Sequence, residues 1–291
     1  MRTTPRSWPA GLAALTLLAG CESSFDVDFV AGPAPEDSTV TVRVEGVDLR
    51  QIDGDIEEVR RNDIGEFISQ AGAEDDANEL VTNAKIDNGE YAGVRLILAD
   101  DAGTLEVEGD PDEPIEPTDA ADTRDTEVAF DFDDGDDGND IRIVVALDLV
   151  LSLSQDQDTG EVTLDPVIRA MDSEDAASVG GTIPASRFDD GACGEGTARV
   201  YAFVGSDVEP DERDGNGVEP LAVADIVRTD SNSAGQYQFR FMPPDDYTLA
   251  FTCESEFENG LEPADDEDID FFEGADIRLD PGEDLTVDFD A

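Results

Sequence analysis

The stretch Ile141-Arg-Ile-Val-Val-Ala-Leu-Asp-Leu-Val-Leu-Ser-Leu153 carries an apolar side chain at every second position over thirteen residues. Arg142, Asp148 and Ser152 lie on the other face. A repeat of two is the period of a β-strand, whereas a helix would spread these apolar residues around its circumference. The length predicts either one strand that bends across two sheets or two successive strands.

The same alternation of apolar and polar residues continues on both sides of this stretch. The turn dipeptide Asn88-Gly89 predicts a strand, turn and strand over residues 85–99, and Asp158-Thr159-Gly160 predicts a turn into the next strand. The acidic, proline-containing residues 109–125 predict a loop with nothing to bury. Strands are expected at 39–49, 128–132, 162–164, 198–204, 221–228, 236–241, 246–253, 275–279 and 285–289.

These strands predict an all-β protein with two tandem β-sandwich domains. The small, acidic residues 172–181 end in glycine and are expected to be a linker. The first domain is then residues 39–171 and the second residues 182–291. Residues 21–38 are acidic, contain proline and are expected to form a flexible tether in front of the first domain.

The first domain resembles a family of domains of unknown function, DUF4382. The resemblance depends on Gly89-Glu90-Tyr91-Ala92-Gly93-Val94-Arg95-Leu96, which is similar to the family hallmark "aGxYtxIRL", and on Leu164-Asp165-Pro166-Val167-Ile168 downstream. The Thr-Asp-Ala-Pro lead-in of the family is missing here. The resemblance implies a β-rich module of exported proteins without assigned chemistry, and it transfers no catalytic residue.

The second domain resembles the carboxypeptidase regulatory-like, transthyretin-type sandwich. Gly235-Gln236-Tyr237-Gln238-Phe239, followed by Tyr247-Thr248-Leu249, is similar to the pattern "dxxGxYxfxxlpxGxYxl". Asp246 stands where the family has its second glycine. Modules of this kind are structural or binding appendages more often than enzymes.

Residues 1–20 have the profile of an export signal. Arg2 and Arg6 precede an apolar run from Ala10 to Ala19, which is too short to span a bilayer. Leu18-Ala19-Gly20-Cys21 resembles the lipobox of bacterial lipoproteins, which implies that the signal is cleaved before Cys21 and that Cys21 is acylated. Glu22, in place of Asp, favours the outer membrane. The alternative is a cleaved secretory signal followed by an unmodified cysteine.

Charge limits the partners and the habitat. The formal charge is −57, and removal of two arginines with the signal would leave −59. Nucleic acids and anionic headgroups would be repelled. The 14 Phe and 4 Tyr in alternating runs predict a folded chain rather than a disordered acidic one. One lysine, Lys85, among 17 basic residues is typical of halophilic proteins, so we expect an organism that lives in salt.

Two residue types bear on chemistry. The chain has no His, which excludes Ser-His-Asp and Cys-His nucleophile arrangements and zinc sites that need imidazole. Carboxylate pairs could serve an acid–base hydrolase, but in so acidic a chain they discriminate nothing. Cys193 and Cys253 form an even pair in an exported chain and are predicted to be disulfide-bonded.

Two acidic loops could bind calcium, which prefers six to eight oxygen ligands. The first loop carries Asp131, Asp133, Asp134, Asp136, Asp137 and Asp140, and the second carries Asp211, Asp214, Asn216 and Glu219. Neither has EF-hand spacing, and a solvated acidic surface explains both. We therefore expect no metal site, no cofactor and no catalytic residue.

The predicted function is that of a non-enzymatic, lipid-anchored lipoprotein of the cell envelope that acts as a structural or interaction module. Its partners are expected to be the membrane, through the anchor, and an unknown envelope protein or glycan. The alternative is a calcium- or glycan-binding surface module. Tyr201, Tyr237, Tyr247, Phe271 and Phe272 could stack on sugars, although their alternation with polar residues favours the core.

Overall fold

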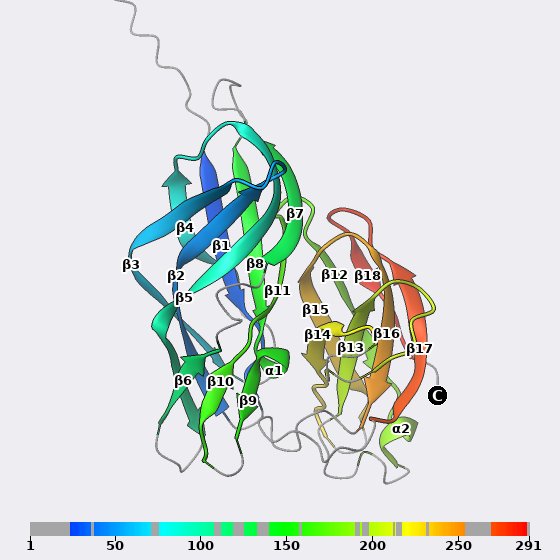
Figure 1. Cartoon of the computed structure of the whole chain (residues 1–291). Coiled ribbons are helices and arrows are strands. Elements are labelled where there is room, and N and C mark those ends of the chain that lie inside the picture. The colour runs from blue at the N-terminus through cyan, green and yellow to red at the C-terminus, as the bar shows by residue number, and fades with distance from the viewer. Residues whose placement is uncertain are drawn as a thin grey trace, which may run out of the picture.

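The computed structural model shows an all-β protein built from two β-sandwiches (Figure 1). It describes residues 24–35, 38–70, 76–107, 112–118, 125–132, 140–156, 159–189, 193, 198–211, 213, 217–230, 233–253 and 269–289. The prediction of an all-β fold is confirmed. Each sandwich has two sheets, which enclose one apolar core.

The first sandwich pairs a four-stranded sheet with a seven-stranded one. The first sheet has the order β11-β8-β1-β4, and the second has the order β3-β2-β5-β6-β10-β9 with β7 on β5. The strands are β1 (Phe25–Ala31), β2 (Ser38–Gln51), β3 (Ile56–Gln70), β4 (Asn78–Ala84), β5 (Gly89–Val107), β6 (Glu113–Pro117), β7 (Asp125–Phe132), β8 (Ile141–Asp148), β9 (Leu153–Gln155), β10 (Val162–Leu164) and β11 (Val167–Asp172).

The regular stretch 141–153 forms two successive strands, which was one of the two predicted outcomes. β8 lies in the first sheet and β9 in the second, and the one-turn helix α1 (Leu149–Ser152) joins them. The Asp148 side chain caps this turn by accepting a hydrogen bond from the Leu151 amide at 3.0 Å. Prediction of a strand through residues 149–152 was therefore wrong, because the cap favours a helical turn at the point where the chain changes sheets.

The predicted tether is also wrong for residues 25–31. Phe25–Ala31 forms β1, which lies between β8 and β4 in the first sheet. Its inward residues Phe25, Val27 and Phe29 are fully buried in the core. These residues alternate with acids in the same way as in any half-buried strand, so the acidic composition concealed a core strand.

Two further expectations about the first sandwich need correction. Residues 85–88 are outside the strands, and β4 and β5 belong to different sheets, so residues 85–99 do not form the predicted pair of strands. The predicted loop 109–125 contains β6, which lies between β5 and β10 in the second sheet and whose Ile115 is buried in the core. One inward apolar residue was enough to add this short strand to the sheet.

The second sandwich begins earlier than expected. It contains the three-stranded sheet β15-β12-β18 and the four-stranded sheet β14-β13-β16-β17. Its elements are β12 (Ala177–Ile183), α2 (Ser186–Asp189), β13 (Arg199–Val204), β14 (Pro220–Asp225), β15 (Gly235–Met242), β16 (Asp246–Thr252), β17 (Phe271–Arg278) and β18 (Asp284–Thr286). Residues 177–181 were predicted as linker but belong to β12, where Val179 is buried, so only a short turn separates the sandwiches.

A buried apolar interface joins the two sandwiches. Val150 and Leu151 of α1 pack with Tyr201, Phe203 and Val223 of the second sandwich in one buried cluster. Val30, Val144 and Ala146, on the outer face of the first sheet, form a second cluster that contacts Phe241. The apolar residues on both faces of β8 are explained by this arrangement, because the second sandwich covers the face that would otherwise meet water.

Buried polar contacts fix this interface. The Asp148 carboxylate accepts a hydrogen bond from the Val223 amide at 2.7 Å. Arg169, which is 1% exposed, donates to the backbone carbonyls of Phe241 and Arg240 at 2.9 and 3.0 Å. Arg213 donates to the Leu151 carbonyl and pairs with Asp165, both at 2.7 Å. The two sandwiches are therefore held in one orientation by apolar packing and directed hydrogen bonds.

Candidate functional site

The sequence-predicted site residues are distributed over three places. Cys21 lies outside the described residues. Cys193 and Cys253 are joined in a disulfide with their Cα atoms 4.7 Å apart, and both are buried at the edge of the second core. Their position in the core indicates a structural bond rather than a reactive thiol.

The two acidic loops fall largely outside the described residues, which exclude 133–139 and 214–216. Of the remaining members, Asp140 accepts hydrogen bonds from the Ser24 amide and hydroxyl at 2.9 and 3.0 Å. In the part of the chain that the structure describes, no group of three acidic or cysteine side chains is placed to hold a metal ion. Calcium binding, the alternative raised from composition, is not tested by these residues.

The aromatic side chains considered for sugar stacking belong to the interior. Tyr201, Tyr237 and Tyr247 are at most 3% exposed, and Phe272 packs against the second core. Phe271 packs edge-on against Tyr201. Burial raises the pKa of the Tyr237 and Tyr247 hydroxyls well above the ordinary value, so both stay neutral donors. The expectation that most of them are core residues is confirmed.

Every basic residue whose side chain the structure describes has a partner within the fold. Arg43 pairs with Glu66 and Asp101 at 3.0 and 2.7 Å, and Arg199, which is fully buried, pairs with Asp225 at 2.9 Å. The basic residues concerned are Arg43, Arg50, Lys85, Arg95, Arg142, Arg169, Arg187, Arg199, Arg213, Arg228, Arg240 and Arg278. These positive charges are thus engaged within the fold.

A polar groove with a volume of about 760 Å³ lies over the outer face of the sheet β15-β12-β18. Gly180 is one of its lining residues. It packs closely on β15, since a Cβ at this position would lie 2.9 Å from the Tyr237 carbonyl oxygen. The exposed amides of Gln236 and Gln238 line one side. The groove is lined by Ser178, Gly180, Gly181, Thr182, Asp225, Val227, Gln236, Tyr237, Gln238, Asp284, Leu285, Thr286 and Asp288.

The chemistry of this groove is that of hydroxyl, amide and carboxylate groups without a cation. Asp288 accepts hydrogen bonds from the Thr182 amide and hydroxyl at 2.9 and 2.7 Å, and Asp284 accepts one from Ser178. An anionic ligand would be repelled by these carboxylates. Apolar atoms contribute slightly more of the lining surface than polar atoms do, so a ligand would need both apolar faces and polar groups. Neutral, hydroxyl-rich molecules remain as ligands whose donors and acceptors the lining can match.

Sequence reasoning missed this groove because its residues come from strands that are distant in the chain. Alternation of Gln236 and Gln238 with the inward Tyr237 indicated an exposed polar face. It did not indicate that β12 and β18 would lie beside β15, with a glycine at the centre. The signal that the sequence offered was a polar strand face beside a glycine. That combination is too common in β-proteins to predict a groove.

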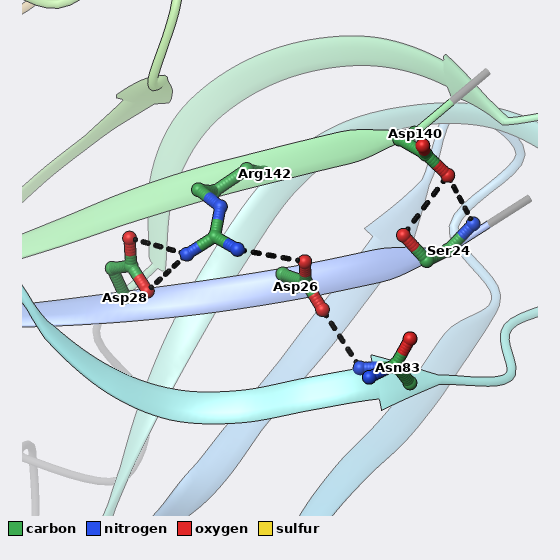
Figure 2. A network of polar contacts seen from close by, with 6 residues as sticks. All are labelled: Ser24, Asp26, Asp28, Asn83, Asp140 and Arg142. Atoms are coloured by element: carbon green, nitrogen blue, oxygen red, sulfur yellow. Dashed lines mark hydrogen bonds and ion pairs between the residues drawn. The ribbon is translucent and has the colours of Figure 1, made fainter. Parts of the chain in front are cut away.

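A second polar site lies where the described chain begins (Figure 2). Arg142 of β8 pairs with Asp26 at 3.0 Å and with both oxygens of Asp28 at 3.0 Å. Asp26 also accepts a hydrogen bond from the backbone amide of Asn83 in β4 at 2.7 Å. The hydrogen bond with Asp28 is the main cause that raises the pKa of Arg142 above its ordinary value. This network ties β1 to both neighbouring strands immediately after residue 24.

No helix among the described residues is both long and apolar enough to cross a bilayer. Comparison with known proteins finds no matching family model and no matching curated protein. Among solved structures, a candidate adhesin from Bacteroides ovatus is similar at 10% identity with a TM-score of 0.21, covering 92% of this chain and 87% of that one. A candidate cell adhesion protein from Bacteroides fragilis matches at 9% identity with a TM-score of 0.18, covering 92% of both chains. Scores of this size establish no common fold.

Proposed function

We propose that this chain is a lipid-anchored protein of the cell envelope, displayed on the outer membrane, that acts as a non-enzymatic structural or interaction module. The observation that carries the proposal is the position of Cys21, the last residue of the lipobox-like sequence, four residues before Phe25. Phe25 is fully buried and opens a strand of the first core. An acylated Cys21 would therefore be joined directly to the folded body.

The short connection defines how the body is held. A chain of four residues spans about 14 Å at most when fully extended. The first sandwich would therefore lie close to the membrane surface, rather than on a long tether. Two or three acyl chains give stable anchoring, because each buried CH₂ contributes about 0.8 kcal/mol.

Surface charge supports a saline habitat for this protein. The formal net charge of the chain is −57, and the basic side chains that the structure describes are engaged within the fold. A body this acidic, held near anionic headgroups, needs strong screening. The Debye length falls from about 8 Å at physiological ionic strength to about 3 Å at 1 M salt. We therefore propose a halophilic origin.

Mass spectrometry of the protein purified from its own envelope tests the anchor. The expected product begins at Cys21 and carries the added mass of a diacylglyceryl group and an N-acyl chain. Cys21→Ser should abolish acylation and move the protein out of the membrane fraction, whereas Ser23→Ala should leave both unchanged. An intact leader with a bare Cys21 thiol would contradict the proposal.

A second candidate function is binding of a neutral envelope glycan, and the groove on the sheet β15-β12-β18 favours it. Calorimetry with neutral glycans at molar NaCl should give saturable binding to the full chain. The double variant Gln236→Ala and Gln238→Ala should lose that binding, whereas Gln70→Ala on the first sandwich should keep it. Absence of binding, or binding that the double variant retains, would remove the groove as a glycan site.

A further inference from the structure

The first strand of the body is placed to carry load. β1 pairs in parallel with β8 along its whole length, from Phe25 beside Ile141 to Ala31 beside Leu147. On its other side β1 pairs antiparallel with β4, from Phe25 beside Ala84 to Phe29 beside Asn78. The Gly32 amide extends the parallel pairing with a 2.7 Å hydrogen bond to the Leu147 carbonyl. The strand that follows the candidate anchor is therefore enclosed on both edges.

Side-chain packing locks the register of β1. Phe25, Val27 and Phe29 point into the core and are fully buried, and Phe29 packs against Phe67 with ring centroids 4.6 Å apart. A slip of one residue would turn these side chains to the outer face and bury Asp26 and Asp28 in their place. Sliding along β8 therefore requires the apolar contacts and the backbone hydrogen bonds to break together.

Ion pairs on the outer face of the sheet also hold β1 in register with β8 (Figure 2). Arg142 lies opposite Asp26 in the register and bridges Asp26 and Asp28, so one guanidinium joins two successive residues on the same face of β1. Asp140, just before β8, accepts the Ser24 amide and hydroxyl. These contacts begin at the first described residue, where a pull from the anchor would arrive.

The opposite end of β8 leads to the second sandwich. Asp148, the last residue of β8, accepts the Val223 amide at 2.7 Å, and α1 packs against the second sandwich. In Figure 1 the second sandwich and the strands β9 and β10 lie away from the end at which β1 begins. Load on the second sandwich would therefore reach β8 at its C-terminal end, while the anchor pulls β1 at its N-terminal end.

We propose that β1 and β8 form a load-bearing shear clamp. Because the two parallel strands are pulled at opposite ends along their common axis, their hydrogen bonds share the load and must fail together. Peeling would break the same bonds one after another, at lower force. The clamp would hold the body on its membrane anchor under mechanical stress; this role rests on the anchoring proposed at Cys21, whereas the mechanical asymmetry does not.

Single-molecule pulling of the full chain tests the clamp by comparing two directions. In the shear direction, handles are attached to the Cys21 thiol and to Thr159→Cys in the turn between β9 and β10. In the peeling direction, they are attached to Cys21 and Asn139→Cys, two residues before Ile141, which lies beside Phe25 at the same end of the β1–β8 pair. The disulfide occupies the remaining two cysteines. The expected result is a several-fold higher rupture force in the shear direction.

Equal rupture forces in the two directions would overturn the clamp. A matched pair of variants gives a second readout in the shear direction: Arg142→Gln should lower the rupture force, whereas Arg278→Gln should not. Arg278 forms a 3.2 Å pair with Asp246 in the second sandwich and its side chain is 70% exposed. An unchanged force for Arg142→Gln would remove the ion pairs from the clamp. Because the handles replace the lipid, failure here leaves acylation of Cys21 untouched, and failure of acylation leaves the forces unchanged.

Discussion

Removal of the Asp148 side chain should weaken the first sandwich and its junction with the second at the same time. One carboxylate oxygen accepts the Leu151 amide of α1 at 3.0 Å, and the other accepts the Val223 amide of β14 at 2.7 Å. The side chain is buried, with Asp148 only 2% exposed. Asp148→Ala would leave the backbone amides of Leu151 and Val223 without these acceptors in the buried interface between the sandwiches.

The expected loss follows from these two contacts. Loss of an N-cap side chain costs about 0.5–2 kcal/mol. A buried N–H left without a partner costs about 1–3 kcal/mol. Together, Asp148→Ala should lower the free energy of unfolding by about 1.5–5 kcal/mol. This is a large fraction of the roughly 5–15 kcal/mol that stabilises a typical folded protein.

Urea unfolding followed by far-UV circular dichroism measures this loss, and amide hydrogen exchange locates it. Exchange of the Val223 and Leu151 amides should accelerate. Asp156→Ala is the matched control, since Asp156 also accepts two hydrogen bonds, from the Thr159 amide and hydroxyl, but lies exposed in a turn. It should cost about 0.5 kcal/mol or less. Losses of similar size in the two variants, or a loss below about 1 kcal/mol for Asp148→Ala, would refute the reasoning.

Three further predictions concern the whole chain. Replacing Cys193 and Cys253 by Ala should lower the free energy of unfolding by about 4 kcal/mol, because the disulfide spans a sequence separation of 60 residues; a change below about 1 kcal/mol in denaturant unfolding would contradict this. Raising NaCl from about 0.1 M to 1 M should raise the melting temperature, because salt screens the repulsion among the carboxylates; calorimetry that shows no rise would contradict the halophilic proposal. Burial raises the pKa of Tyr91, Tyr237 and Tyr247 in the folded state, so their contribution to stability is complete below the unfolded-state pKa of about 10 and is lost as the pH rises further. Unfolding at pH 8, 10 and 11 should show that decline, and a constant free energy over this range would exclude it.

The sequence predicted most strands because strand periodicity is a local property. The expected segments 236–241 and 246–253 correspond to β15 and β16, within one or two residues at each end. The sequence predicted the wrong structure where acidic or proline-rich composition was given more weight than the alternation of apolar and polar residues. Phe25-Asp-Val-Asp-Phe29 alternates as regularly as the predicted strand 39–49, yet its acids and the prolines after it suggested a tether.

Contacts between distant segments account for the remaining differences. Val144 and Ala146 interrupt the polar face of β8, and their meaning becomes clear only when Phe241 of the second sandwich covers them. Leu149 belongs to the first core and Leu151 to the interface cluster, so the chain needs a helical turn between them. A pattern with a period of two cannot specify such a turn.

The sequence by itself determined the all-β class, the two β-rich halves and the inward position of most aromatic residues, because alternation fixes which face of a strand is buried. Tertiary structure alone decided which strands became neighbours. The pairing of Asp26 with Arg142 joins residues 116 apart, and the groove at Gly180 needs three separate strands. Backbone hydrogen-bonding groups are alike in every strand, so the choice of partner depends on how the complete set of apolar faces can be buried at once.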